Sequence, residues 1–295
     1  MNATDPPRVP PGAALALAVV AVSTGALFVR LSDAPALVVA AYRCTLSTLV
    51  LGAVGWRACR SEWPQLSRTD ASLALVTGLA LALHFAAWIS SMAYTSVASS
   101  LVIVNTTPLW VALATPFVSK DRLRSGTLLG ISVSVVGCAV IGWGDLQLEG
   151  RALLGDGLAL IGAWMSAVYM LTGRRLRKRL TLLPYVTACY GSAAALLLIA
   201  VFASGSSLVG YTPATYGALV ALALVPQVIG HSSYNYALRY VSAALTSVVA
   251  LGECIGASLL AWMFLHEAPS SASWIGGSIV MIGVLLAVRA ERSVE

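Results

Sequence analysis

Charged side chains stand inside long apolar stretches of this sequence, and they are the first residues that could do chemistry. Glu253 and Arg43 each lie several residues from the end of such a stretch. A charged group in an apolar medium costs roughly 3 kcal/mol or more unless it is paired or hydrated. Glu253 could therefore carry a proton, bind a cationic group of a ligand, or serve as a structural partner for Arg43 or for backbone and hydroxyl groups.

Two other stretches combine histidine, aromatic and amide side chains at the spacing of a helix. His84 and Trp88 are four residues apart and would share one helical face. A second stretch carries Gln227, His231, Tyr234 and Asn235. A lone histidine in a helix is more often a packing residue, but two such stripes in apolar surroundings favour the lining of a cavity.

Residues 105–108 (NTTP) form a third group, because a proline inside a helix removes a backbone hydrogen bond and favours a kink. We expect Asn105 and Thr107 to lie at that bend, where freed carbonyl groups could bind a ligand. Trp164 and Tyr169, with Ser166 between them, are weaker candidates. The predicted binding residues are His84, Trp88, Asn105, Thr107, Trp164, Gln227, His231, Tyr234, Asn235 and Glu253.

The elements that must position these residues are membrane-spanning helices. The chain is 58% hydrophobic and only 10% charged, whereas an ordinary soluble domain has about 25% charged residues. Its apolar runs are long and continuous, which predicts an all-α membrane protein and not a barrel. We place ten spans at residues 13–30, 36–56, 71–93, 97–119, 126–143, 153–172, 182–203, 214–237, 243–265 and 272–289.

The basic residues orient these spans. If the N-terminus is cytoplasmic, fifteen of the eighteen Lys and Arg residues fall in cytoplasmic segments. This bias predicts that both tails, residues 1–12 and 290–295, lie in the cytoplasm, with the spans in the inner or plasma membrane. The net charge of +6 comes from these anchoring segments, so we expect no nucleic-acid partner.

The spans repeat. Residues 94–137 align without a gap on residues 240–283, an offset of 146. We therefore divide the chain into two repeats, residues 13–143 and 144–289, each with five spans. An odd number of spans makes the two copies cross the membrane in opposite senses. Inverted repeats are typical of secondary transporters, whose substrate site lies near the midplane between the halves.

The same offset pairs the candidate residues. Trp88 corresponds to Tyr234 and Thr107 to Glu253, so the expected kink and the charge lie in different copies. We expect a small metabolite to bind a central cavity between the halves, with Glu253 near an amine or coupling proton movement. The halves would then open to each side of the membrane in turn.

Two stretches of the repeat carry a resemblance. Residues 98–108 (ASSLVIVNTTP) and 243–253 (AALTSVVALGE) resemble the drug/metabolite transporter superfamily, specifically its EamA family. The resemblance covers almost the whole chain and implies transport of a metabolite such as an amino acid, often export, driven by a gradient. It also favours a structural role for Arg43, because an arginine at this place is widespread in that family. The family usually has Glu-Pro where this chain has Glu253-Cys254, so we expect span 243–265 to be straighter than span 97–119.

An intramembrane enzyme and a passive channel are the alternatives. The chain has no HExxH, GxSxG, Walker A or CxxC motif, and no two of its five cysteines have metal-ligand spacing. We therefore expect no catalytic residue, no metal and no cofactor. Inverted repeats would also suit a channel. GxxxG spacings at residues 126–130 and 252–256 permit close helix packing and leave a homodimer open.

Overall fold

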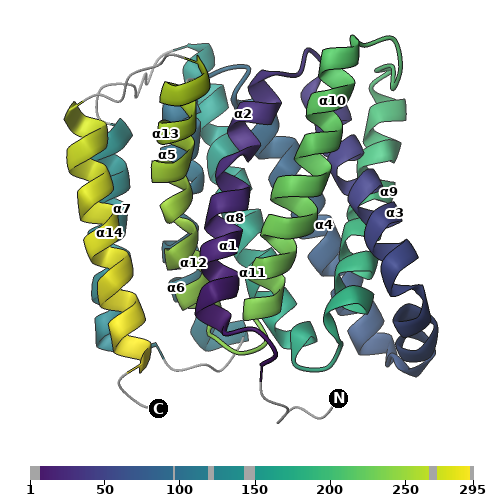
Figure 1. Ribbon diagram of the computed structural model, residues 1–295, viewed down its shortest axis with the longest axis horizontal. Coiled ribbons are helices and arrows are strands. Elements are labelled where there is room, and N and C mark those ends of the chain that lie inside the picture. Colours follow the sequence, from purple (N-terminus) through teal and green to yellow (C-terminus); the bar gives the residue numbers. More distant parts are fainter. Residues whose placement is uncertain (1–6, 96, 119–122, 143–149, 266–270, 293–295) are drawn as a thin grey trace.

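The computed structural model is helical and has no strand within the residue ranges that it describes (Figure 1). These ranges are residues 7–95, 97–118, 123–142, 150–265 and 271–292. The first half contains α1 (Pro11–Ser23), α2 (Gly25–Arg30), α3 (Ala36–Glu62), the short η1 (Trp63–Gln65), α4 (Arg68–Ser91), α5 (Val97–Val104), α6 (Thr107–Val118) and α7 (Ser125–Gly142). The second half contains α8 (Arg151–Arg177), α9 (Leu182–Ala203), α10 (Pro213–Leu222), η2 (Ala223–His231), α11 (Ser232–Ala237), α12 (Ala243–Ala250), α13 (Gly252–Leu265) and α14 (Ser271–Arg292).

The helices build a multi-pass membrane protein. Eight helical segments are long and apolar enough to cross a bilayer, and two shorter apolar helices, Ser125–Val140 and Trp274–Ala290, occupy the places of the predicted fifth and tenth spans. Large apolar side chains cover the outside of the bundle, with Phe117 89% and Phe202 70% exposed. Such an outer surface suits lipid rather than water.

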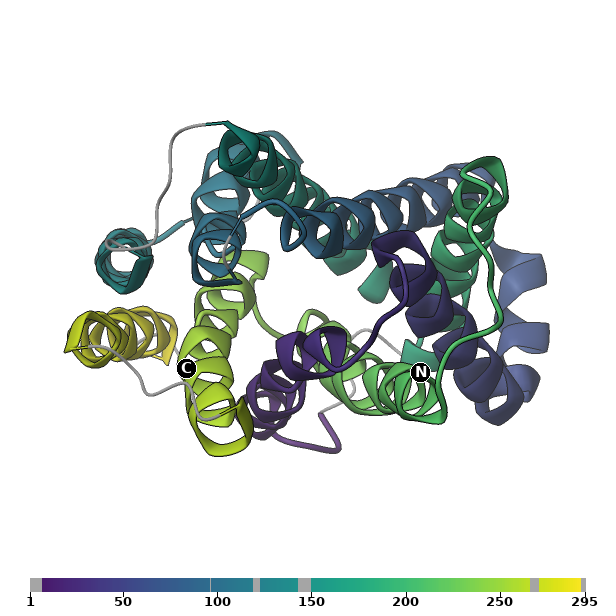
Figure 2. The same cartoon turned by 90° about the horizontal axis from the view of Figure 1, so that it is seen from above.

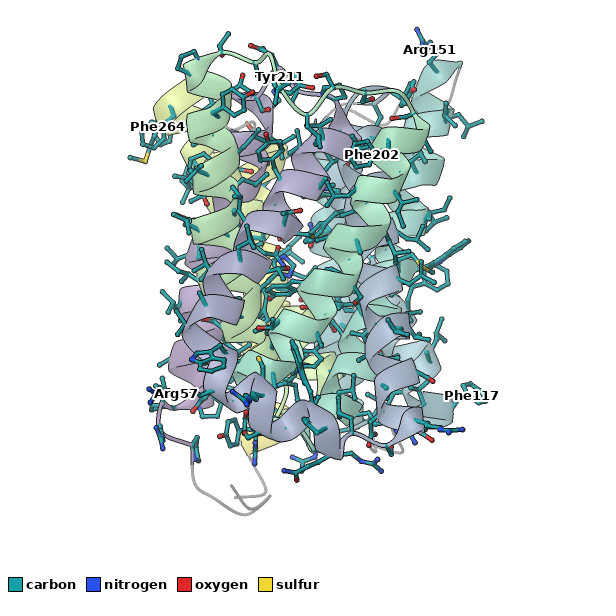
Figure 3. The ribbon with its side chains drawn as sticks, turned by 90° about the vertical axis from the view of Figure 1, so that its right-hand side faces the viewer. Arg57, Phe117, Arg151, Phe202, Tyr211 and Phe264 are labelled. Atoms are coloured by element: carbon teal, nitrogen blue, oxygen red, sulfur yellow. The ribbon has the colours of Figure 1, made fainter. Side chains whose placement is uncertain are left out.

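The ends of the bundle follow the predicted topology of the chain. Figure 1 shows that α1 begins and α14 ends at the same end of the molecule. Figure 3 places Arg57 and Phe117 at that end and Arg151, Phe202 and Phe264 at the opposite end. The loops at residues 119–122 and 266–270 lie outside the described residues.

The two repeats are related by an inversion that the packing of α7 against α14 makes visible. These helices lie side by side at one edge of the bundle (Figures 1 and 2). A Cβ atom on Gly130 would lie 2.6 Å from the carbonyl oxygen of Gly283, and one on Gly137 would lie 2.7 Å from that of Gly276. Adding 146 converts 130 to 276 and 137 to 283, so the two contacts are images of each other. The helices therefore run antiparallel about a pseudo-twofold axis.

The fourth span breaks where the sequence predicts a kink. α5 ends at Val104 and α6 begins at Thr107. At the break the backbone switches to three-residue turns, in which the Thr106 amide donates to Ile103 and the Leu109 amide donates to Thr106. Pro108 has no amide hydrogen to donate, so the break costs fewer helical hydrogen bonds here than elsewhere.

The expectation of a straighter ninth span is wrong. α12 ends at Ala250 and α13 begins at Gly252, and the same three-residue turns occur: the Leu251 amide donates to Val248 and the Cys254 amide donates to Leu251. Proline is therefore not required for this break. A glycine stands at the break itself, and a Cβ atom there would lie 3.0 Å from the Val19 side chain of α1. Close packing of α1 and the low helix propensity of glycine account for the bend.

The eighth span departs from regular helix in a way that the sequence did not indicate. Its middle, η2, is a nine-residue π-helix that contains Pro226. Wide turns of this kind often occur at functional sites. The Ser47 hydroxyl of α3 donates to the Ala223 carbonyl at 3.1 Å, which holds the start of the wide turn against α3. The π-helix contributes one residue, His231, to the cavity described below.

Candidate functional site

A cavity lies inside the bundle between the two halves. Its wall comes from α1, α3, α4, α5 and α6 of the first half, and from α8, η2, α11, α12 and α13 of the second. It offers about 60 Å³ of space to the centres of water-sized spheres. Because one water needs about 10–15 Å³ of such space, there is room for roughly four to six water molecules. The cavity suits a small molecule rather than a bulky one.

The cavity brings together eight of the residues that the sequence singled out. They are Arg43, His84, Trp88, Asn105, Thr107, His231, Tyr234 and Glu253. The structure does not bring three other candidates, Trp164, Gln227 and Asn235, into the wall. The wall is otherwise aromatic and aliphatic, which is usual for small-molecule sites with a few polar groups.

The helix breaks bring Asn105, Thr107 and Glu253 to the cavity. The Thr107 hydroxyl donates to Val104 at 2.7 Å, and the Asn105 amide donates to Leu101 at 2.8 Å. The Thr107 hydroxyl thus satisfies a carbonyl group that Pro108 cannot pair, whereas the Leu101 carbonyl also accepts the backbone N–H of Asn105. Glu253 stands at the start of α13, where a carboxylate interacts favourably with the helix dipole.

Arg43 is held rigidly in the wall. Its side chain is 1% exposed, its Nε donates to the Gln227 carbonyl oxygen Oε1 at 2.6 Å, and its Cζ lies 4.0 Å from the ring centroid of Phe85. The buried Nη2 atom has no hydrogen-bond partner. A guanidinium that is fixed on one side and unsatisfied on the other can donate to an anionic group of a ligand.

Glu253 supplies the opposite charge. Its side chain is half-buried and lines the cavity. Within the described part of the chain it makes no ion pair and no hydrogen bond, and the ion pair that the structure shows there joins Arg179 to Asp70 at 2.7 Å. Glu253 and Arg43 therefore form no direct salt bridge, although each acts electrostatically on the other. The cavity holds one positive and one negative group that do not neutralise each other directly.

Rings surround these two charges. His84 and Trp88 stack with centroids 6.1 Å apart and planes 6° from parallel. Phe85 meets His231 edge to face at 5.3 Å, and Tyr234 meets His231 at 6.2 Å. Since 85 plus 146 equals 231, Phe85 and His231 are repeat mates in contact between the halves. Faces of such rings attract apolar groups and cations.

Several ring and hydroxyl groups of the wall are ready to bond a ligand. The Nδ1 atom of His84 lies 2.8 Å from the Gly162 carbonyl and must donate to it, which leaves Nε2 as an acceptor in the neutral ring. Buried atoms without a hydrogen-bond partner include Trp88 Nε1, His231 Nδ1 and Tyr234 OH. Buried polar groups are normally satisfied, so a cluster of unsatisfied ones around a cavity indicates a polar occupant.

Trp164 lies outside the cavity. It is 40% exposed on the outer surface and packs edge to face against Trp110 with centroids 5.4 Å apart. It shares α8 with Tyr169, which does line the cavity. Five residues separate them, so they point to different sides of the helix.

Gln227 and Asn235 lie behind the wall. Both are fully buried, and Gln227 is occupied with Arg43. The Asn235 amide donates to the hydroxyls of Tyr169 and Tyr190 at 2.6 and 3.1 Å. A regular helical period put both residues on one face with His231. The π-helix changes that period between Gln227 and His231, whereas Asn235 follows in the regular helix α11. Their polar side chains position wall residues instead of meeting the cavity.

One aromatic wall residue, Phe85, was missed by reasoning from polar stripes. Tyr169 and Ser166, which the sequence offered beside Trp164 as weaker candidates, do line the cavity. The repeat contained a signal for Phe85, because it is the image of His231. Tyr169 and Ser166 are three residues apart and thus share a face of α8.

The GxxxG glycines are used within the chain. A Cβ atom on Gly126 would lie 2.6 Å from the Cβ atom of Ala290, and Gly130 packs against α14 as described. Gly252 and Gly256 face Val19 and Ser23 of α1. These spacings therefore do not indicate a surface for a second copy of the chain.

Comparisons with known proteins agree with this architecture. Residues 11–143 and 153–289 each match the EamA-like transporter family. A protein of Bacillus subtilis, named as the uncharacterized transporter YdfC, is 22% identical over 185 residues, which cover 62% of this chain and 60% of that protein. An uncharacterized transporter of Archaeoglobus fulgidus is 23% identical over 281 residues, which cover 94% of this chain and 96% of that protein.

The fold is also that of a protein already solved by crystallography. The two superpose with a TM-score of 0.78 at 21% identity, over 97% of this chain and 99% of the other. At this identity the likeness concerns the fold alone. The two matches to the family cover both repeats and almost the whole chain. The chain therefore belongs to the EamA-like transporter family.

Proposed function

We propose that this transporter works by secondary active transport and exports a small zwitterion, such as an amino acid, by alternating access. The observation that carries the proposal is the cavity wall, where Arg43 and Glu253 face one small space without neutralising each other. A ligand with one positive and one negative end would satisfy both. The aromatic rings of Trp88 and Tyr234 would enclose its apolar part.

The inverted halves supply a physical route to alternating access. Broken fourth and ninth spans meet the cavity from opposite halves, and a break lets one part of a span tilt without the other. If the halves rock about the pseudo-twofold axis, the cavity opens to one side and then to the other. We propose that both tails are cytoplasmic and that the protein resides in the plasma or inner membrane, as the basic residues predict.

Counterflow into proteoliposomes tests the function. Vesicles loaded with an unlabelled mixture of L-amino acids should take up a tritiated mixture in a saturable manner, and uptake should fall when the internal mixture is omitted. A channel would give flux without stimulation by internal amino acids, and an enzyme would return altered molecules. No counterflow by the folded protein would overturn the proposed cargo.

Two tryptophans provide a matched pair of variants. Trp88→Ala removes a ring from the cavity wall, whereas Trp164→Ala removes a ring from the outer surface. We expect Trp88→Ala to reduce counterflow at least about tenfold, since a buried aromatic ring contributes about 1.5 kcal/mol or more to binding. Trp164→Ala should retain most of it. Equal rates in both variants would refute the assignment of the cavity as the site.

Proton coupling is a separate part of the proposal. A carboxylate that faces the cavity without an ion pair could take up a proton when the cargo leaves. An imposed pH gradient should then drive uphill flux in the wild type and fail to do so in Glu253→Gln. Uphill flux of the same size in both proteins would exclude Glu253 as the coupling group.

A further inference from the structure

We propose that Arg43 recognises the anionic group of the cargo and that Gln227 is its positioning residue. This inference rests on the proposed function and names the residues that would require a carboxylate at one end of the cargo. It replaces the structural role that the family resemblance favours for Arg43. The geometry around the guanidinium group carries it.

The guanidinium group of Arg43 makes one hydrogen bond, at Nε, and one ring contact, at its face. Nε donates to Gln227 and the plane lies over the Phe85 ring, so the protein fixes the direction of the side chain. A purely structural arginine that is 1% exposed would be expected to use its remaining donors on carbonyl or carboxylate groups. Instead Nη2 is buried and has no partner in the protein, and the side chain lines the cavity.

The surroundings of Gln227 fix it in a position that orients the guanidinium group of Arg43. It is fully buried in the π-helix, where the Ser47 hydroxyl bonds the carbonyl of Ala223 one turn earlier. The Gln227 oxygen accepts from Arg43, and its Nε2 has no partner. A neutral acceptor orients the guanidinium group without cancelling its charge. A carboxylate at the same place would cancel that charge. The positive charge therefore stays available to the cavity.

Charge balance points to the same ligand. An unneutralised guanidinium group in a membrane interior is costly, and so is an unneutralised carboxylate. Arg43 comes from the first half and Glu253 from the second, and no ion pair joins them within the described residues. A cargo with a carboxylate toward Arg43 and an amine toward Glu253 would neutralise both charges at once. A cargo with an amine alone would leave Arg43 unsatisfied.

Matched probes separate the two poles. L-alanine, L-valine and L-threonine are each compared with their primary amides, which keep the amine and side chain and lose the negative charge. Affinity is measured by the ligand-dependent rise in the melting temperature of the purified full-length protein. In the wild type each acid should bind about 10- to 100-fold more tightly than its amide, the range typical of a charge-assisted hydrogen bond.

Variants of Arg43 and Gln227 should lower this ratio by weakening the binding of the acids. The amides should bind Arg43→Gln at least as tightly as the wild type, because a positive charge is removed from the cavity. Arg43→Gln should bring the acid-to-amide ratio to about one. Gln227→Met, which keeps the volume but removes the acceptor, should lower it by roughly 3- to 10-fold because the guanidinium group loses its orientation. Arg43→Lys should keep part of the preference. Arg57→Gln, which removes an exposed charge, is the control and should leave the ratio unchanged.

The outcomes distinguish this inference from the proposed function. If none of the three acids raises the melting temperature of the wild type, the proposed cargo class is wrong and the inference falls with it. If acids and amides bind equally to the wild type, or if folded Arg43→Gln keeps the preference, Arg43 does not recognise the anion while the cavity remains the site. Amide binding by Arg43→Gln that is at least as tight as in the wild type shows that the cavity is intact.

Discussion

Repeat mates in the two halves are alike where helices pack against each other and differ where they line the cavity. Where helices touch, mates make the same contact: Gly130 meets Gly283 and Gly137 meets Gly276. Where the cavity is lined, mates differ in chemistry. Thr107 is the image of Glu253, although both line the same cavity.

Arg43, the charged wall residue of the first half, also has a repeat mate of different chemistry. Arg43 corresponds to Cys189, since 43 plus 146 equals 189, and Cys189 is a fully buried packing residue. Each half therefore contributes one charge to the cavity and a neutral residue at the mate position. Backbone contacts between helices tolerate no added atom and keep the symmetry, whereas the proposed cargo has two different ends and would require a different residue from each half. The largest consequences of the difference should appear at the charges.

The largest effect is expected from neutralising Glu253, compared with a change at its repeat mate, Thr107. Glu253→Gln should weaken binding of L-valinamide, which carries an amine and no carboxylate, by about 10- to 150-fold, corresponding to about 1.5–3 kcal/mol. Thr107→Val should change it by less than about threefold, because the Thr107 hydroxyl is already bonded to Val104. Thermal-shift titration of both proteins measures this. Equal losses in the two variants would mean that the halves share the amine-binding role.

A smaller effect is expected at the symmetric glycine contacts between α7 and α14. Gly137→Ala and Gly283→Ala should each destabilise the protein by about 1–2 kcal/mol, because the new methyl group meets the backbone of the facing helix. As repeat mates they should agree within about 0.5 kcal/mol. Equilibrium unfolding in mixed micelles provides the measurement. Gly157→Ala is the control, since a Cβ atom there meets nothing within 4 Å and alanine favours the helix. A large difference between the two mates would contradict the pseudo-twofold packing.

The smallest effect is expected where mates already share a shape. His231→Phe gives the second half the residue of its image, Phe85, and keeps the ring contact between them. Stability should change by less than about 1 kcal/mol, as for other volume-conserving substitutions. Binding of L-valine should fall only roughly 2- to 10-fold, through loss of one neutral hydrogen bond from the imidazole. A loss of 100-fold or more in folded protein would assign His231 a charged or central role instead.

The sequence predicted those parts of the fold that follow from periodicity and charge. A gapless repeat with an odd number of spans requires inversion, and Pro108 correctly located the break between α5 and α6. The break at Leu251 was not predicted, because no proline marks it and the packing of α1 against Gly252 is a tertiary contact. Local signals alone do not contain such tertiary contacts.

Within the site, the sequence separated polar from apolar residues better than it separated the cavity wall from the layer behind it. Gln227 and Asn235 are polar because they bond Arg43 and Tyr169, and only the three-dimensional contacts distinguish that from meeting a ligand. The π-helix could not be anticipated from a regular period. Trp164 shows the converse error, because an aromatic ring in a membrane helix can face lipid as well as a cavity.

One structure would test the central claim most directly, that opposite charges from opposite halves hold the two ends of one zwitterion. The protein should be saturated with whichever of L-alanine, L-valine and L-threonine raises its melting temperature most and then examined by cryo-electron microscopy. We predict the ligand carboxylate about 3 Å from Arg43 Nη2 and its amine about 3 Å from the Glu253 carboxylate. Ligand density away from both side chains, or a direct ion pair between Arg43 and Glu253, would contradict the account.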